Sequence, residues 1–357
     1  MKKKGIAVVG RVAEGTELLD GQTVKTKILY EELRKTFPDR KIICIDTYQY
    51  RKYIVSILYR TVKAFAECEH FFVLLSRNGR KFFFPILNGM NSLFHRKLYH
   101  DVVGGALPGE AAARPALVKQ LKRFIVNWVE LPDMKAELEK LGVRNVEVLP
   151  NFKRLSILGE DQLPAGHRGE PYVFTMFSRV VKEKGMETAA RSAAELNRRA
   201  GRIRAVVHIY GPVDPVYEEE FRKLLEDYKD CVVYQGCIPY NESVKALSGS
   251  YMLLFPSVYP GEGMPGTIID AFSAGLPVIA SDWRYNRDMV QDGVTGCCYE
   301  WQKPEQLTER MAYAVDHPAE IDAMRPACLR EAQKYTPESA MRQIVKKMRE
   351  TADGGCV

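Results

Sequence analysis

The sequence lacks several patterns that would assign a chemistry at once. No apolar run is long enough to cross a bilayer. The short apolar stretch at residues 5–10 predicts a first buried strand rather than a signal peptide. No GxxxxGK[ST], HExxH or GxSxG motif is present, and the six histidines show no ligand spacing. These absences argue against a P-loop NTPase, a zinc protease of the HExxH type and an α/β-hydrolase.

The eight cysteines are scattered along the chain. None forms a CxxC pair, although Cys297 and Cys298 are adjacent. This distribution argues against a disulfide framework or a zinc site and fits a reducing cytoplasm.

The positive charge is concentrated in the first half of the chain. Of a net charge of +7, residues 1–155 contribute 28 Lys and Arg against 16 Asp and Glu, whereas residues 156–357 contribute 24 against 29. A basic half suggests an anionic partner, such as a membrane surface, nucleic acid or an anionic substrate, although most individual charges are expected to be solvated. Nucleic acid is disfavoured because the chain has no basic-aromatic recognition motif and its second half is acidic.

Strand-like and helix-like segments alternate, in a length sufficient for two domains. Alternation of this kind predicts an α/β fold with parallel sheets covered by helices on both faces. The predicted strands are residues 5–10, 40–46, 70–76, 145–152, 172–179, 205–212, 231–238, 251–257 and 277–282. The predicted helices are residues 23–37, 52–68, 186–200, 218–228, 267–274 and 336–352.

A polar segment rich in Gly and Pro, residues 153–171, predicts an interdomain linker. We therefore expect an N-terminal domain over residues 1–155 and a C-terminal domain over 156–335. A terminal helix over 336–357 is expected to pack back toward the first domain. Two doubly wound halves in tandem suggest a ligand-binding cleft between them.

The stretch GEGMPGTIIDAFSAGLPVIASD contains the most informative residues. A strand precedes it, and a helix is predicted to open near Gly266 and Thr267, where free N–H groups can bind phosphate. An ordinary capped turn would explain the glycines equally well. Glu262 favours the binding site, because an acid beside phosphate needs another partner, and sugar hydroxyls are good ones. Asp270, about one turn into the helix, could reach a second pair of hydroxyls such as a ribose diol.

Two cations follow the first strand of the second domain. Arg179 and Lys184 could balance a pyrophosphate or a departing nucleotide. The alternative is two solvated cations on a loop. In the first domain, Gly21, Gln22 and Thr23 lead into a helix with Thr23 as candidate N-cap, so their N–H groups could face the cleft. The loop before them lacks GxGxxG spacing, which argues against an oxidoreductase.

The first domain offers weaker signals near residue 100. His95 and His100 could be polar cleft groups, and surface positions are the more common explanation. Asp101 could end a strand at the cleft, where Gly104 and Gly105 would permit close approach of a sugar. A simple turn explains the two glycines equally well.

Taken together, these residues resemble the retaining GT-B glycosyltransferases of family 4. The likeness covers nearly the whole chain and is carried by the acid-x7-acid pair Glu262 and Asp270, by Arg179 with Lys184-Gly185, and by LPNF at residues 149–152. The family's second acid is usually Glu, so Asp270 is a departure. Met264 also replaces an expected aromatic residue, and the first-domain histidine motif of many relatives is not found. The motifs are also similar to those of a subgroup that builds capsule, exopolysaccharide or O-antigen repeats.

The resemblance implies two Rossmann-like domains facing each other across a cleft, with a nucleotide-sugar bound mainly to the second. Glu262 would hold the sugar, Asp270 the ribose, and Arg179 and Lys184 the charge of the leaving nucleotide. The remaining donor-binding residues would be Gly21, Gln22, Thr23, Gly211, Pro212, Gly236, Ile238, Gly263, Met264, Pro265, Gly266 and Thr267. Acceptor-side residues would be His100, Gly104 and Gly105.

The resemblance further implies retention of the anomeric configuration with no metal and no cofactor. The acceptor would be a saccharide or a polyprenyl-diphosphate-linked saccharide docked on the first domain. The basic surface of that domain would suit the anionic inner face of the plasma membrane. The alternatives are an epimerase of the same fold and a nucleotide-sugar-binding protein without turnover.

Overall fold

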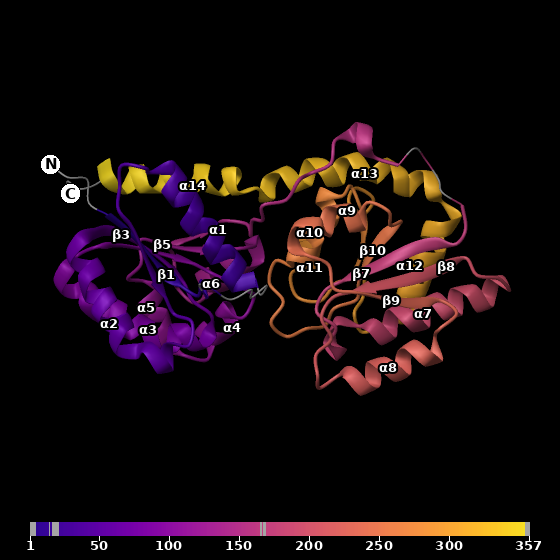
Figure 1. The fold of residues 1–357 in the computed structure, drawn as a ribbon, viewed down its shortest axis with the longest axis horizontal. Coiled ribbons are helices and arrows are strands. Elements are labelled where there is room, and N and C mark those ends of the chain that lie inside the picture. Colours follow the sequence, from indigo (N-terminus) through magenta and orange to yellow (C-terminus); the bar gives the residue numbers. More distant parts are fainter. Residues whose placement is uncertain (1–4, 14, 16–20, 165, 167–168, 354–357) are drawn as a thin grey trace. The chain divides into compact units, whose positions relative to one another are not determined.

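The computed structural model describes residues 5–13, 15, 21–164, 166 and 169–353, and divides the chain into two units (Figure 1). The first unit comprises Met1–Arg154 together with Tyr335–Val357, and the second comprises Leu155–Lys334. Each unit contains one six-stranded sheet whose strand pairs are all parallel.

The first sheet has the strand order β2-β1-β3-β4-β5-β6. Its strands are β1 (Gly5–Gly10), β2 (Ile42–Asp46), β3 (Cys68–Leu74), β4 (Lys97–Asp101), β5 (Val126–Val129) and β6 (Val146–Val148). The order reverses between β1 and β3. In open α/β sheets such a reversal leaves a crevice beyond the carboxyl ends of the two strands, which is where ligands usually bind.

Helices cover the first sheet on both faces. They are α1 (Gly21–Thr36), α2 (Tyr50–Glu67), α3 (Arg77–Phe94), α4 (Leu107–Ala112), α5 (Pro115–Leu121), α6 (Pro132–Lys140) and α14 (Pro337–Asp353). Ile6 and Val8, which alternate along β1 and so share a face, are buried in one cluster with Leu29 of α1 and Ile344 of α14. The terminal helix α14 thus belongs to the core of the first unit. Residues 354–357 of the predicted terminal element lie outside the described part.

The second sheet has the strand order β12-β11-β10-β7-β8-β9. Its strands are β7 (Tyr172–Phe177), β8 (Ala205–Tyr210), β9 (Val232–Gly236), β10 (Met252–Phe255), β11 (Val278–Ser281) and β12 (Gly296–Tyr299). Its order reverses between β7 and β10, the two strands that precede the predicted cations and the glycine-rich stretch.

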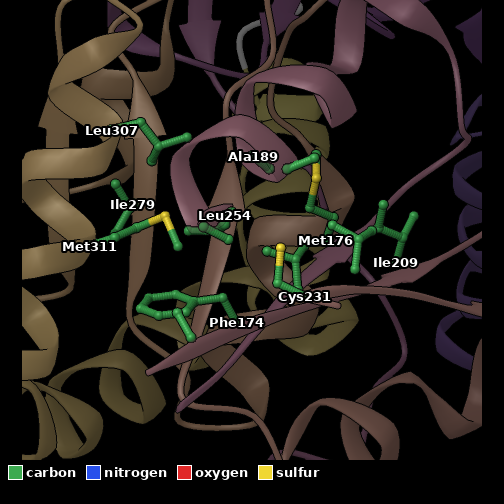
Figure 2. Close-up of a cluster of buried hydrophobic side chains, with 14 of the residues drawn as sticks. Phe174, Met176, Ala189, Ile209, Cys231, Leu254, Ile279, Leu307 and Met311 are labelled. Carbon is green, nitrogen blue, oxygen red and sulfur yellow. The ribbon is translucent and has the colours of Figure 1, made fainter. Parts of the chain in front are cut away.

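The second unit buries one face of its sheet under α7, α8 and α12. Figure 2 shows this core, in which Phe174 of β7 and Leu254 of β10 lie with Ala189 of α7 and Met311 of α12. The helices of the unit are α7 (Met186–Ala200), α8 (Glu218–Asp227), α9 (Ser243–Leu247), α10 (Gly266–Ser273), α11 (Asn286–Met289), α12 (Glu305–Asp316) and α13 (Pro318–Ala332). Short 3₁₀ segments are η1 (Glu160–Gln162), η2 (Lys182–Lys184), η3 (Tyr240–Glu242) and η4 (Gln333–Tyr335).

The segment predicted as a linker, residues 153–171, is partly packed. Arg154 belongs to the first unit, where its guanidinium pairs with Glu31 at 2.7 Å and Glu32 at 2.6 Å. Four residues later the Leu158 N–H donates to the Ser273 carbonyl of the second unit at 3.0 Å. The change of unit therefore takes place within a few residues, and residues 165, 167 and 168 of the segment lie outside the described part.

Candidate functional site

The loops that follow β7 and β10 are tied together at the reversal point of the second sheet. The Thr267 hydroxyl at the start of α10 donates to the carbonyl of Phe177, the last residue of β7. The Val258 N–H, just after β10, donates to the Glu183 carbonyl of η2 at 2.8 Å. These two hydrogen bonds place the predicted cations and the glycine-rich stretch at one edge of one sheet.

Glu262 is anchored through one carboxylate oxygen. Its Oε2 accepts from Lys184 Nζ at 2.6 Å and from Ser257 Oγ at 2.6 Å. The side chains of Lys184 and Glu262 are only 13% and 9% exposed, and Ser257 is fully buried. Within the described residues no hydrogen bond is made by the other oxygen, Oε1. The arrangement fixes the carboxylate and leaves one of its oxygens for a ligand.

Both cations, Arg179 and Lys184, lie close to the ring of Tyr259. Lys184 Nζ lies 5.3 Å from its centroid, and the guanidinium carbon of Arg179 lies 5.9 Å from it. Lys184 is also 5.1 Å from the Phe255 ring. Such distances permit cation–π attraction. Arg179 is exposed, and it forms no ion pair with the residues that the structure describes, so its charge is available to an anion.

Gly185 explains why the Lys184 loop can approach the β10 loop so closely. Its φ is +80°, and a Cβ built on it would lie 2.5 Å from the Pro256 carbonyl oxygen. A side chain here would meet both backbone strain and a collision with backbone. The glycine of the Lys-Gly pair is therefore needed for the contact between the two loops.

A further layer of hydrogen bonds supports the loop that carries Glu262. Ser281 Oγ, at the end of β11, donates to the Ser257 carbonyl at 2.6 Å, and Asn286 Nδ2 donates to the Ser281 carbonyl at 3.0 Å. Trp283 Nε1 donates to the Tyr259 carbonyl at 2.9 Å. The sequence analysis missed these residues. The available signal was that Ser257 and Ser281 are polar residues at the ends of two apolar runs, which become adjacent parallel strands.

The start of α10 is open to an anion. Its N-cap is Pro265, which makes no side-chain capping bond, and the first turn contains no acid. The first N–H groups of a helix have no partner within the helix, and together they carry a partial positive charge. Gly263 and Met264 lead into this start and are buried, whereas Gly266 and Thr267 are half-buried. The arrangement can bind a phosphate group next to the cations.

Asp270 has different surroundings from Glu262. It is 1% exposed, and its Oδ1 accepts from Ser243 Oγ of α9 at 2.8 Å. Glu262 lies in the loop and Asp270 inside the helix, against α9. The two acids of the predicted motif therefore do not form a single carboxylate cluster.

The ends of β8 and β9 continue the same edge. The Gly211 N–H donates to the Gly236 carbonyl at 2.9 Å, and Pro212 is exposed with its carbonyl accepting from the Val180 N–H at 2.9 Å. Gly211 has φ +136°, and a Cβ on it would lie 1.9 Å from the Ser178 carbonyl oxygen. The backbone of Gly211 thus packs beside Arg179, while Ile238 is half-buried after β9.

Comparisons with known proteins agree with this geometry. Residues 160–334 match the family model described as Glycosyl transferases group 1. The structure of Anabaena HepE in complex with UDP and glucose superposes with a TM-score of 0.74 and 11% identity, covering 98% of this chain and 100% of that one. This full-length superposition decides the architecture.

The fold is GT-B.

Two curated relatives extend the comparison of this GT-B chain. D-inositol 3-phosphate glycosyltransferase 1 of Catenulispora acidiphila is 24% identical over 289 residues, which are 76% of this chain and 68% of the relative. The amylovoran biosynthesis glycosyltransferase AmsK of Erwinia amylovora is 24% identical over 183 residues, which are 50% of this chain and 42% of the relative. Several curated relatives are matched over only about half of their own length. The matches support a GT-B glycosyltransferase.

In the first unit, the predicted residues Gly21, Gln22 and Thr23 form the start of α1. Gln22 Nε2 donates to the carbonyl of Leu74, the last residue of β3, at 3.0 Å. Thr23 is the third residue of α1 rather than its N-cap, and its hydroxyl accepts from Arg11 Nε at 3.0 Å. These residues lie at the reversal point of the first sheet, and residues 16–20 before them lie outside the described part.

His100 is a buried residue of β4 and not a surface group. It is fully buried, its Nδ1 lies 3.0 Å from Asn127 Oδ1, and its ring packs 4.9 Å from that of Phe84. Burial, assisted by the charge of Arg80, lowers the pKa of His100 to about 3. The surface position expected for this histidine is therefore wrong, and its acceptor-side role stays a prediction.

The other residues predicted near position 100 lie in a turn. Gly104 has φ +79°, and Gly105 is buried before α4. His95 is exposed at the C-terminal end of α3. The glycines can still admit a ligand to the backbone, and a turn alone also requires the conformation of Gly104.

The described part of this GT-B chain lacks two kinds of feature. Residues 5–353, with the gaps given above, contain no group of three or more His, Cys, Asp or Glu side chains placed to hold a metal ion. Over the same residues no helix combines the length and the apolar character that a membrane span requires.

Proposed function

We propose that this GT-B chain is a retaining glycosyltransferase of the family 4 type, which moves a hexose from a nucleotide-sugar to a saccharide or lipid-linked acceptor. The process would be bacterial cell-surface polysaccharide synthesis. The observation that carries the proposal is the carboxylate of Glu262, held through one oxygen by Lys184 and Ser257 beside the open start of α10. The likeness to AmsK, a glycosyltransferase of amylovoran biosynthesis, supports the polysaccharide assignment.

The diphosphate of the donor would lie at the start of α10, against the backbone of residues 263–267. Arg179, which has no ion pair among the described residues, would contact it from the β7 loop. Lys184 would supply a second positive charge 2.6 Å from Glu262. Charge that is already in place when the nucleotide leaves lowers the barrier without any reorganisation.

The sugar would bind to Glu262. With Oε2 occupied by two donors, Oε1 is the oxygen that would accept hydrogen bonds from sugar hydroxyls. A carboxylate that cannot rotate would orient the sugar ring at the reacting carbon, and orientation of this kind lowers the barrier to reaction.

The nucleoside would lie along the ends of β8 and β9, with the base near Gly211, Pro212, Gly236 and Ile238. Asp270 would serve the ribose. Its carboxylate is already fixed by Ser243 through Oδ1, so it would act as a preset acceptor rather than a mobile one. The donor-binding role expected for Gly21, Gln22 and Thr23 of the first unit stays a prediction.

The reaction would proceed with retention. The bond between the anomeric carbon and the diphosphate oxygen breaks, and the acceptor hydroxyl oxygen bonds to the same face of that carbon. The proton of the hydroxyl passes to the departing diphosphate. Two cations and a helix start supply the positive charge that this step needs, so we propose that it requires no metal ion.

The acceptor would dock on the first unit, near the turn formed by the half-buried Gly104 and the buried Gly105. We place the protein in the cytoplasm, where nucleotide-sugars are available. The scattered cysteines, none of them in a CxxC pair, support a reducing compartment.

A panel of nucleotide-sugars tests the proposal by thermal shift, followed by assay of each stabilising compound for release of nucleoside diphosphate. A ligand at 100 times its Kd should stabilise its unit by about 2.7 kcal/mol. Binding without release would favour the non-catalytic alternative. Release of free, epimerised sugar would favour the epimerase. No response to any nucleotide-sugar would overturn the proposal.

A further inference from the structure

Strands β11 and β12, at one end of the second sheet, are each followed by an acid and then a tryptophan. The two dipeptides are Asp282-Trp283 after β11 and Glu300-Trp301 after β12. The last residues of the two strands are register partners in a parallel pair. Each tryptophan is thus the second residue beyond its strand, and both lie at the carboxyl edge of the sheet, where ligands bind in folds of this kind.

The two indoles contact each other edge to face. Their ring centroids are 4.8 Å apart and their planes are inclined at 79°. In such a pair each ring keeps at least one face clear of the other. The Trp301 N–H donates to Asp282 Oδ1 at 2.8 Å, and the Asp282 N–H donates to the Tyr299 carbonyl at 2.8 Å. The backbone that carries the pair is therefore fixed at both strand ends.

One carbonyl group connects this pair to the carboxylate proposed to bind the sugar. The Tyr259 carbonyl accepts from Trp283 Nε1 at 2.9 Å and from the Glu262 N–H at 3.1 Å. The Trp283 indole therefore borders the loop that carries Glu262. Because its N–H already has a partner, the rest of this ring presents only apolar surface.

Trp301 is the exposed member of the pair. It is 39% exposed, Trp283 is half-buried, and the third tryptophan of the chain, Trp128, is buried in the core of the first unit. Among the described Phe, Tyr and Trp side chains of the second unit, the exposed ones are Trp301 and Tyr313, and the Tyr313 ring is stacked on His317 at 4.1 Å. A large ring left exposed at a ligand-binding edge is typical of a recognition surface.

Charged groups that can bind hydroxyls flank the exposed ring. Asp282 Oδ2 lies 3.5 Å from Arg287 Nη2, and Glu300 Oε2 lies 2.9 Å from Lys303 Nζ, with both side chains of the second pair about half exposed. A sugar ring carries C–H groups on its faces and hydroxyls around its rim. The C–H groups suit the negative face of an indole, and the hydroxyls suit carboxylates and cations.

The strand order places the pair relative to the proposed donor site. Along the sheet in the order β9-β8-β7-β10-β11-β12, the base is proposed at β9 and β8, the diphosphate between β7 and β10, and the hexose at Glu262 after β10. Trp301 follows β12, two strands beyond β10, and two strand spacings amount to about 10 Å. This span exceeds the width of one pyranose ring, so a sugar on Trp301 is a different ring from the hexose on Glu262.

We propose that Trp301, supported by Trp283, binds a sugar ring of the acceptor by stacking, so that the acceptor is an oligosaccharide or carries one. The continuity of the pair with the loop of Glu262 selects a saccharide as the occupant. The proposal rests on the proposed function and adds to it a sugar-binding subsite on the second unit. Trp301 is a binding residue in this proposal and has no part in the chemical step.

Fluorine NMR of the full-length protein labelled with 5-fluorotryptophan tests the proposal. The chain has three tryptophans, so three signals are expected, and Trp→Phe variants assign them. The probes are lactose, cellobiose and N,N′-diacetylchitobiose, added without any donor. We expect at least one disaccharide to shift the Trp301 signal most and the Trp283 signal less. The signal of Trp128, buried in the first unit, should not move. No shift of Trp301 with any of the three would overturn the proposal.

Sorbitol separates stacking from general contact with hydroxyls. It offers hydroxyls but has no ring face, so it should leave the Trp301 signal in place. A shift with sorbitol as large as that with the disaccharides would overturn the stacking proposal. A Trp301 signal that instead moves with protein concentration in the absence of sugar would assign the ring to self-association, which also contradicts the proposal.

Three variants test the aromatic ring itself. Trp301→Leu keeps an apolar side chain without an aromatic face, and the shift of Trp283 should then require about 3- to 10-fold more disaccharide, because an aromatic contact of this kind is lost. Trp301→Phe should bind nearly as the wild type does. Tyr313→Leu is the matched control, since it removes the other exposed aromatic ring of the unit. Equal weakening in Trp301→Leu and Tyr313→Leu, or wild-type binding by Trp301→Leu, would contradict the proposal.

The stabilisation of each variant by the nucleotide-sugar separates this subsite from the proposed function. Trp301→Leu should be stabilised by the nucleotide-sugar as much as the wild type is, because the donor lies at β7 to β10 in the proposal. Failure of the wild type to bind any nucleotide-sugar would overturn the proposed function, whereas the fluorine shift is measured without donor and reports only on the saccharide subsite.

Discussion

Replacing Lys184 with alanine removes the cation that joins η2 to Glu262. The ammonium lies 2.6 Å from Glu262 Oε2, and the two side chains are 13% and 9% exposed. Loss of the ammonium leaves the carboxylate with Ser257 as its remaining donor and removes one positive charge from the place proposed for the diphosphate. Two effects are therefore expected, one on stability and one on turnover.

The stability effect follows from the hydrogen bond to a charged group. Removing such a bond at a nearly buried position costs about 1.5–3 kcal/mol. For turnover, loss of one preorganised donor costs about 10²–10³ in kcat. Because Arg179 would remain as a second cation, we expect a decrease of at least about 10-fold.

Lys182→Ala is the matched control. Lys182 belongs to the same 3₁₀ turn and also pairs with a glutamate, Glu220, at 2.7 Å, but both partners are more than half exposed. An exposed pair of this kind contributes little. Lys182→Ala should therefore leave kcat and the thermal midpoint close to those of the wild type.

The assay is steady-state kinetics at saturating donor, with a double-mutant cycle of Lys184→Ala and Glu262→Gln. Because the two side chains are in direct contact, the double variant should lose less than the product of the two single losses. Unchanged turnover of Lys184→Ala at saturating donor would refute the reasoning. Equal losses in Lys184→Ala and Lys182→Ala would refute it too.

Three further predictions concern the metal, the two acids and acid stability. Activity should survive excess EDTA, and activity lost to EDTA but restored by magnesium or manganese would contradict this. Asp270→Asn should raise the donor KM with kcat nearly unchanged, and Asp270→Glu should keep most activity. Glu262→Gln should instead lower kcat. An Asp270→Asn variant that loses thermal stability at unchanged KM would limit the role of Asp270 to packing against α9. Burial lowers the pKa of His70 to about 4 and that of His100 to about 3, so the unfolded chain takes up their protons first as pH falls below about 6.5. Each should thus remove about 2 kcal/mol of stability between pH 8 and pH 5, and urea unfolding with equal free energies at the two pH values would contradict this.

The parallel α/β architecture could be predicted because the periodicity is strong and local. Residues 186–200 were predicted as a helix and form α7, and residues 5–10 form β1. Residues 81–94 gave no clear prediction, because Pro85 and Gly89 interrupt an apolar run. The structure has one helix there, α3, in which Pro85 is on the exposed side. The helices α12 and α13 of the second unit were not predicted.

Local sequence patterns could not predict which strand ends lie next to each other in the sheet. Arg179 and Glu262 are 83 positions apart in the sequence, and only the order of β7 and β10 in the sheet brings their loops together. The cations and the loop acid could be proposed because each follows a predicted strand. The contact of Ser257 with Glu262 could not be proposed, because a polar residue at the end of an apolar run does not reveal which side chain it will meet.

The same limit explains the errors in the first unit. His100 directly precedes Asp101, the residue that could end a strand at the cleft, and a ligand-binding group is expected at such a position. The structure instead turns its ring into the space between β4 and the helices, against Phe84 and Phe124. Side-chain direction at a strand end depends on the register of the whole sheet, and a short segment does not reveal that register.

The anomeric configuration of the transferred sugar tests the central claim most directly. The protein is incubated with the nucleotide-sugar that stabilises it and with a saccharide acceptor, and the anomeric proton of the product is followed by NMR. We predict a glycoside with the anomeric configuration of the donor, formed together with one equivalent of nucleoside diphosphate and formed more slowly by Glu262→Gln. An inverted product, or free sugar without transfer, would contradict the proposed retaining glycosyltransferase.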